Sequence, residues 1–222
     1  MSLARRALAE GVGTFGFVFL GCASTVANVF PTGRFETVGI GLAHAAALGI
    51  FVAGTLGISG GHLNPAVTLG FLSTRRIDAR TAGGYIAAQL VGAILAAFAL
   101  KYSYPLTVTN ISTLGTPALA GSVSFGRGIA LEALGTFMLM STVYGTIVGH
   151  DRPALGGLGV GIALLAIILA IGPATGGAVN PARALGPAIA SGNLIGQAIY
   201  WIGPIVGAVA AAQLWDRMIL RR

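Results

Sequence analysis

Long apolar stretches, separated by short polar connections, follow one another along the whole chain. Six of these stretches are long enough to cross the hydrocarbon core of a bilayer, which is roughly 30 Å thick and takes about 17 to 25 helical residues. They are Leu8–Phe30, Val38–Ile58, Ala82–Leu100, Gly128–Gly149, Ala154–Ile171 and Leu194–Leu214. The pattern therefore predicts an all-α membrane protein with six transmembrane helices.

Two further apolar segments, Pro65–Leu72 and Pro181–Ala190, are too short to cross a membrane. A short apolar segment at membrane depth must be buried in protein or line a wet cavity, because lipid offers no partners for irregular backbone. We therefore expect both segments to be re-entrant half-helices.

The second half of the chain repeats the first. Ala9–Phe15 is echoed by Leu131–Phe137, and Gly60–Ala66 is echoed by Gly176–Ala182. Each half holds three spans, an odd number, so the second copy enters the membrane from the opposite face. We expect inverted repeats whose half-helices meet tip to tip at the functional site. The expected boundaries are 1–222 for one transmembrane domain, about 1–104 for repeat one and about 125–222 for repeat two.

Composition agrees with lipid as the surrounding medium. Hydrophobic residues make up 55% of the chain and charged residues only 9%, whereas a soluble domain carries about a quarter charged residues. A formal net charge of +7 would suggest a nucleic-acid partner for a soluble protein. The positions of the charges favour a role in membrane orientation instead. Nine arginines fall on one side of the six spans, namely Arg5, Arg6, Arg75, Arg76, Arg80, Arg152, Arg217, Arg221 and Arg222, and three cations fall on the other, namely Arg34, Lys101 and Arg127.

The side of the membrane with more arginine is the cytoplasmic side by the positive-inside rule. We therefore expect both termini in the cytoplasm, the lipid bilayer as a partner and no binding of nucleic acid. The short termini and loops favour a prokaryotic protein, which would lie in the inner (cell) membrane.

Little in the sequence suggests catalysis or a bound metal. Cys22 is the only cysteine, which excludes an intrachain disulfide and a multi-thiolate metal site. The apolar spans offer no nucleophile–base pair and no cluster of metal ligands with the usual spacing. We expect no enzyme activity, no metal and no cofactor.

Both short apolar segments begin with the same tripeptide, Asn64-Pro65-Ala66 in the first half and Asn180-Pro181-Ala182 in the second. Asparagine is a favoured N-cap, and proline suits the first helical position because its missing N–H would be unsatisfied there anyway. One such turn predicts only a helix start. Two turns at corresponding places in inverted repeats indicate a function.

With these features the chain resembles the aquaporins of the major intrinsic protein family. The resemblance covers the whole chain and rests on Glu10 and Glu132 in the repeats, on both Asn-Pro-Ala turns and on Arg183. It implies a right-handed bundle of six tilted helices and two half-helices, a single-file pore in each subunit and a homotetramer. It also implies passive conduction of water and small neutral solutes.

Proton exclusion follows from the two turns if they meet. Each half-helix N-terminus carries about half an elementary positive charge, so two of them facing one point repel cations, including a hydrated proton. A water that accepts hydrogen bonds from Asn64 and Asn180 must aim its hydrogens outward, which interrupts a proton wire.

The resemblance also assigns a selectivity constriction. Arg183 matches the family's constriction arginine, and the register from the two asparagines gives His44, Ile168 and Gly177 as the other three positions. This set resembles that of tonoplast-type plant channels associated with ammonia as well as water. Two structural alternatives stand beside this interpretation: His44 as a buried helix-packing histidine, and Arg183 as a snorkelling or structurally paired arginine.

Glycerol facilitators are the nearest rivals within the family. They place Asp directly after the constriction arginine and lack an aromatic pair in the sixth span. Here Ala184 follows Arg183, and Tyr200-Trp201 stands in the sixth span. The pattern favours a water channel, although Ala184 is not the serine usual there, and a glycerol or small-polyol facilitator is the alternative.

A proton-coupled secondary transporter is the alternative from another class, because inverted repeats and broken helices occur there too. Its proton carriers would be Glu10 and Glu132, the paired carboxylates inside the spans. Their symmetric placement favours another role, in which each accepts backbone N–H groups from a re-entrant loop. We expect His62, two residues before Asn64, to brace its loop as well.

Overall fold

The structure, a computed structural model, describes residues 1–33, 35–149 and 153–220. Arg34, Arg152, Arg221 and Arg222 lie outside the described residues, so four of the cations that predict the orientation are not placed. The secondary structure of the described residues is entirely helical, which confirms the predicted class. The α-helices are α1 (Leu3–Ala27), α2 (Glu36–Ser59), α3 (Pro65–Ser73), α4 (Ala79–Ser103), α5 (Leu106–Ser112), α6 (Phe125–Val143), α7 (Gly156–Thr175), α8 (Pro181–Ser191) and α9 (Ile199–Leu214).

Within the described part of the chain, six helical segments are long enough to cross a bilayer. Five of them, α1, α2, α4, α7 and α6 with its π-helical end Tyr144–Val148, have the required length and hydropathy. The sixth, α9, has 16 residues and continues into a five-residue π-helix, Trp215–Ile219. At 1.5 Å per residue the two pieces together are about 31 Å long, which matches the hydrocarbon core.

Some predicted boundaries were wrong. Helix α1 begins at Leu3 rather than Leu8, because the hydroxyl of Ser2 caps it by accepting from the N–H of Arg5. Helix α9 begins at Ile199 rather than Leu194, because the chain first makes turns after α8. The sequence pattern also missed α5, which lies in the connection between the two halves.

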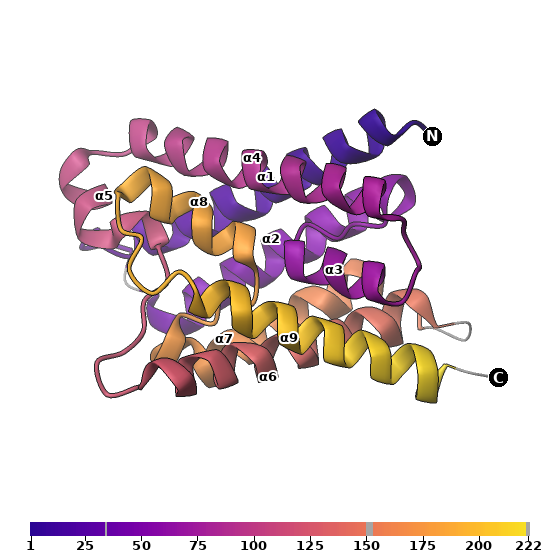
Figure 1. Cartoon of the computed structure of the whole chain (residues 1–222). Coiled ribbons are helices and arrows are strands. Elements are labelled where there is room, and N and C mark those ends of the chain that lie inside the picture. Colours follow the sequence, from indigo (N-terminus) through magenta and orange to yellow (C-terminus); the bar gives the residue numbers. More distant parts are fainter. Residues whose placement is uncertain (34, 150–152, 221–222) are drawn as a thin grey trace.

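The two halves pack in equivalent ways. In the first half α1 packs against α2 and α4, and in the second half α6 packs against α7 and α9. The half-helices cross over, since α3 packs against α9 of the other half and α8 packs against α4. Figure 1 shows α3 and α8 pointing toward each other from opposite ends of the bundle. This is the arrangement that inverted repeats require.

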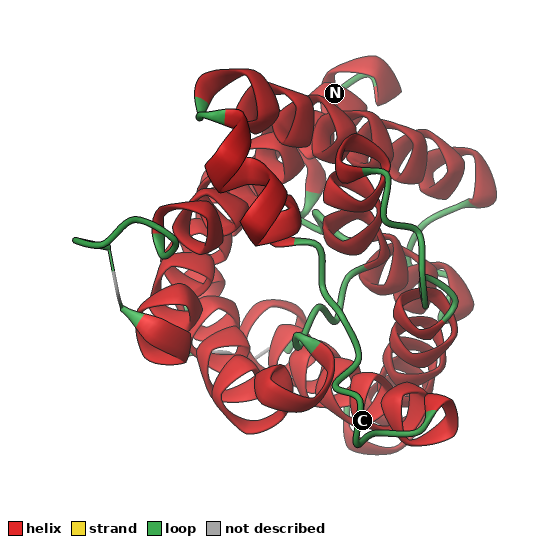
Figure 2. Cartoon of the chain, turned by 90° about the vertical axis from the view of Figure 1, so that its left-hand side faces the viewer, coloured by secondary structure: helices red, strands yellow, loops and turns green. Residues whose placement is uncertain are grey.

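Small residues let the helices approach closely. Where α2 crosses α7, a Cβ on Gly49 would lie 3.2 Å from the carbonyl oxygen of Gly157. Where α6 crosses α9, a Cβ on Gly203 would lie 2.7 Å from the carbonyl oxygen of Ile129. Seen toward one end of the bundle, the helices surround non-helical segments that cross its middle (Figure 2). The helices therefore pack closely against one another and enclose the two re-entrant loops.

Both termini lie at one end of the bundle, and α5 lies at the other (Figure 1). The outer surface carries many exposed apolar side chains, such as Leu8, Ile50 and Leu158, which are 60 to 67% exposed. Exposed apolar side chains along helices of this length are typical of contact with lipid.

Candidate functional site

The two Asn-Pro-Ala turns have nearly the same geometry. Asn64 caps α3, and its Oδ1 accepts from the N–H of Ala66 at 2.9 Å. Asn180 caps α8, and its Oδ1 accepts from the N–H groups of Ala182 at 3.0 Å and Arg183 at 3.2 Å. A proline, Pro65 or Pro181, follows as the first helical residue in each case. Both turns are therefore N-caps of short helices, as the tripeptide predicts.

The side chains of the two asparagines also tie the turns together. The Nδ2 of Asn64 donates to the carbonyl of Val179 at 2.8 Å, and the Nδ2 of Asn180 donates to the carbonyl of Leu63 at 2.9 Å. An NH2 group carries two hydrogens, so each asparagine keeps one donor for another partner. These reciprocal bonds hold the half-helices tip to tip.

Glu10 holds the loop before α3 from within α1. Its Oε1 accepts from the hydroxyl of Ser59 at 2.6 Å and from the N–H of His62 at 2.9 Å. Its Oε2 accepts from the N–H of Leu63 at 2.6 Å and from the Nε2 of Gln89 at 2.8 Å. This fully buried carboxylate therefore satisfies two backbone donors that the loop would otherwise leave unpaired.

Glu132 holds the loop before α8 in the same way. Its Oε1 accepts from the hydroxyl of Thr175 at 2.7 Å and from the N–H of Ala178 at 3.1 Å. Its Oε2 accepts from the N–H of Val179 at 2.7 Å. Each repeat thus has one buried carboxylate, one hydroxyl and two consecutive loop N–H groups, which is the geometry of a structural brace.

One tyrosine completes each brace, a role that the sequence pattern did not predict. The hydroxyl of Tyr85 donates to the carbonyl of Ser59 at 2.8 Å, and the hydroxyl of Tyr200 donates to the carbonyl of Thr175 at 2.7 Å. A signal was present, because Ser59 and Thr175 stand at the same distance before Asn64 and Asn180.

His62 is held on two sides. Its Nδ1 forms a hydrogen bond with the hydroxyl of Thr68 at 3.1 Å, and its ring stacks on Phe71 with 4.4 Å between ring centroids. The same hydroxyl accepts from the Nε2 of Gln89 at 3.0 Å. His62 therefore joins the loop to Thr68 of α3 and, through that hydroxyl, to Gln89 of α4.

The side chain of Arg183 is buried and forms two hydrogen bonds beside the second turn. Its Nη1 donates to the carbonyl of Gly115 at 2.8 Å, and its Nη2 donates to the Nε2 of His44 at 2.9 Å. The Nδ1 of His44 lies 2.9 Å from the carbonyl of Ile40. Because arginine only donates and a carbonyl only accepts, the imidazole carries its proton on Nδ1 and accepts at Nε2. Arg183 forms no ion pair with any described residue.

Three of the four constriction candidates line one vestibule. This cavity has a water-accessible volume of about 200 Å³, and its walls include His44, Ile168 and Arg183. The wall also contains Gly176, whereas Gly177 is not among the lining residues. A Cβ on Gly177 would lie 3.3 Å from the Cα of Ile168, and its φ is +57°. Gly177 therefore also meets a backbone requirement, which the sequence analysis did not foresee.

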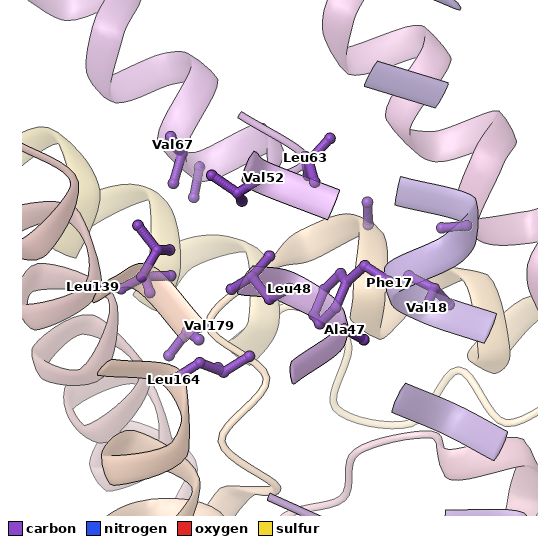
Figure 3. Close-up of a cluster of buried hydrophobic side chains, with 14 of the residues drawn as sticks. Phe17, Val18, Ala47, Leu48, Val52, Leu63, Val67, Leu139, Leu164 and Val179 are labelled. Carbon is purple, nitrogen blue, oxygen red and sulfur yellow. The ribbon is translucent and has the colours of Figure 1, made fainter. Parts of the chain in front are cut away.

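A second, narrower cavity adjoins the turns. Its water-accessible volume is about 20 Å³, little more than the 10–15 Å³ or so that a single water needs. Asn64, Asn180 and His62 supply its polar side chains. Apolar side chains from both halves form the rest of its wall, among them Leu48, Val52, Val67, Leu139 and Leu164 (Figure 3). Such a cavity suits small molecules in single file.

Two half-helices meet inside a bundle of apolar spans, with the narrow cavity at their capping asparagines and the vestibule beside Arg183. This arrangement is that of a membrane pore. The chain belongs to the major intrinsic protein family, whose model matches residues 1–215. It is therefore an integral, multi-pass membrane channel and not an enzyme.

Known relatives cover nearly the whole chain. It is 39% identical to aquaporin TIP4-4 of Zea mays over 224 residues, which are 97% of this chain and 87% of the relative. It is 41% identical to glycerol uptake facilitator protein-like 6 of Lactiplantibacillus plantarum over 217 residues, which are 94% of this chain and 95% of the relative. Its fold is similar to that of the aquaglyceroporin from Plasmodium falciparum, with a TM-score of 0.83, 27% identity and coverage of 98% and 97%.

Proposed function

We propose that this chain is a passive water channel that also conducts ammonia and excludes protons and ions. The observation that carries this proposal is the reciprocal bonding of Asn64 and Asn180 across the meeting point of α3 and α8. It supports a continuous pore in which two helix N-termini face each other at one point, where a proton wire would be interrupted.

Proton exclusion would follow from the hydrogen-bond donors that Asn64 and Asn180 keep free. Each keeps one N–H after bonding to the opposite loop, and both line the narrow cavity. A water there accepts from these donors and turns its own hydrogens toward its neighbours. The positive ends of α3 and α8, about half a charge each, add a barrier to any cation. Water passes singly while the proton wire stays broken.

Selectivity would reside in the vestibule, with His44, Ile168, Gly177 and Arg183 as its filter. Arg183 presents a positive charge without a described carboxylate partner, which opposes cations. Ile168 contributes an apolar wall. The acceptor nitrogen of His44 is already used by Arg183, so the filter offers few side-chain acceptors to a solute. A small neutral molecule such as ammonia should therefore meet a low barrier.

Glycerol is the second candidate substrate. The names of two similar proteins, the facilitator of Lactiplantibacillus plantarum and the aquaglyceroporin of Plasmodium falciparum, refer to glycerol. The aquaporin names of the plant relatives support water instead. Permeability measurements on this chain decide between water and glycerol as its main substrate.

Stopped-flow measurements on proteoliposomes test the proposal. We expect water permeability with a low activation energy that an uncoupler does not change, ammonia permeability above that of empty liposomes, and no proton leak. Ammonia permeability equal to that of empty liposomes would exclude ammonia as a substrate. Saturable flux that collapses with an uncoupler would favour a transporter over a channel. His44→Phe should lower the ratio of ammonia to water permeability, because a larger ring without a nitrogen fills the vestibule.

Assembly and location form the last part of the proposal. We propose that the chain forms a homotetramer and that its termini face the cytoplasm. The orientation agrees with the many arginines near both ends of the sequence, because both termini lie at the same end of the bundle (Figure 1). A prokaryotic inner (cell) membrane is the proposed location; the proposal rests on the short loops of the sequence, and the plant aquaporins among the relatives do not support it. Cross-linking in membranes tests the tetramer, and protease accessibility of tagged termini in oriented vesicles tests the orientation.

A further inference from the structure

Gly21 lies on α1 directly behind the imidazole of His44. A Cβ on Gly21 would lie 2.6 Å from the Cδ2 of His44 and 2.8 Å from its Nε2. Both distances are below 3.0 Å, a separation that real Cβ atoms essentially never show. Because Gly21 lies inside the long helix α1 (Leu3–Ala27), more than one turn from its end, the ring and not the helix backbone would have to move.

The ring of His44 is held on its other sides as well. Its Nδ1 bonds to the carbonyl of Ile40, and its Nε2 accepts from Arg183. The ring of Phe17, also on α1, meets it edge-on with 6.2 Å between centroids and 79° between planes. The side that remains is the vestibule, which His44 lines. A ring displaced from α1 must therefore enter the vestibule.

We propose that Gly21 is a positioning residue of the selectivity filter. Its missing side chain lets the imidazole lie against α1, where Nε2 meets Arg183 and the vestibule stays open. A side chain at this position would narrow the vestibule and break the bond to Arg183, although it touches no solute itself. This inference rests on the proposed function, because it presupposes that His44 and Arg183 select solutes.

Ordinary helix packing is the competing explanation, and the other glycines of α1 distinguish it. A Cβ on Gly11 would meet the carbonyl of Ala88, one on Gly13 would meet Leu63, and one on Gly16 would overlap the ring of Phe51. None of these neighbours is a filter residue. Gly16→Ala is therefore a matched control: the same substitution, on the same helix, against another aromatic ring.

The test is a double-mutant cycle of Gly21→Ala and His44→Ala in the full chain, reconstituted in proteoliposomes. Water and ammonia permeability are measured per channel, together with the thermal unfolding temperature in detergent. We expect Gly21→Ala to reduce water permeability several-fold and to change the ratio of ammonia to water permeability. In the His44→Ala background the same substitution should change neither, because the ring that it displaces is gone. Gly16→Ala should lower thermal stability and leave the permeability ratio at the wild-type value.

Three results would overturn the inference. The first is a wild-type ratio of ammonia to water permeability in Gly21→Ala while His44→Ala changes that ratio. This result would refute the role of Gly21 and leave the proposed role of His44 standing. The second is an equal effect of Gly21→Ala with and without the imidazole. The third is a wild-type ratio in His44→Ala, which would remove the proposed filter and the inference together. If Gly21→Ala alone is too unstable to reconstitute, recovery of the unfolding temperature in the double variant supports the contact, and no recovery refutes it.

Discussion

The two halves of the chain hold their turns with the same brace but add different polar residues to it. Glu10 and Glu132 accept the same pair of loop N–H groups. In the first half, His62 and Thr68 add a buried hydrogen bond, whereas Ala178 and Ala184 stand at the same distances from Asn180. The first loop is therefore the more strongly anchored of the two.

At the third residue after each asparagine, it is the second half that carries the polar side chain. This residue is Val67 in the first half, on the wall of the narrow cavity, and Arg183 in the second half, on the wall of the vestibule. The side chain of Arg183 extends from α8 and donates hydrogen bonds to Gly115 and His44, which lie outside that helix. The common features build two half-helices, and the differences give one side of the pore a charge and the other an apolar wall.

The largest expected effect tests the common brace. Glu10→Ala leaves four buried donors without their acceptor, and Glu132→Ala leaves three. Since an unsatisfied buried donor costs about 1–3 kcal/mol, both variants should lose several kcal/mol or fail to fold, and Glu10→Ala should be the less stable. Thermal unfolding in detergent measures the difference. A more stable Glu10→Ala would contradict the stronger anchoring of the first loop.

Next in size is the effect of removing the charge that only the second half carries. Arg183→Ala takes away the vestibule's cation and both of its bonds, so we expect urea and glycerol permeability to rise about tenfold or more, a change equivalent to about 1.4 kcal/mol in the barrier. Val67→Ala, at the equivalent position, should leave solute selectivity unchanged. Stopped-flow light scattering with each solute decides, and equal solute profiles for the two variants would refute the assignment of selectivity to one side.

A smaller effect is expected for the polar residue that only the first half carries. His62→Ala loses the bond to Thr68 and the stacking on Phe71, which should cost about 1–3 kcal/mol of stability. The ratio of ammonia to water permeability should stay at the wild-type value. A changed ratio at wild-type stability would mean that His62 selects solutes rather than bracing its loop.

The smallest effect concerns the tyrosines. Tyr85→Phe and Tyr200→Phe each remove one hydrogen bond to a loop carbonyl and should each cost about 1 kcal/mol. The two losses should be equal in unfolding measurements, because the contacts are equivalent. A clear inequality would mean that the braces differ in more than the residues that only one half carries.

Local signals predicted most of the architecture. Apolar length predicted the spans, the Asn-Pro pairs predicted where α3 and α8 begin, and the internal repeat predicted that they meet. Each of these signals needs only neighbouring residues or a comparison of one half with the other. The start of α9 and the presence of α5 escaped prediction, because apolar length alone does not tell a turn from a helix at the membrane surface.

The constriction was assigned only through resemblance, and its role in selectivity stays a prediction. His44, Ile168 and Arg183 line one vestibule, whereas Gly177 is not among its lining residues and its backbone packs close to the Cα of Ile168. Its left-handed φ of +57° is a property of the folded loop. No pattern in the neighbouring sequence distinguishes a glycine needed for its backbone from one needed for space.

By itself, the sequence determined the spans, the two capped half-helices and their inverted relation, because these depend on short-range chemistry and on a repeated motif. Only the tertiary structure decided that Asn64 bonds to Val179, that Arg183 bonds to Gly115 and His44, and that Gly21 makes room for the imidazole. The physical reason is distance along the chain. Each of these contacts joins segments that come together only when the two halves pack around one pore.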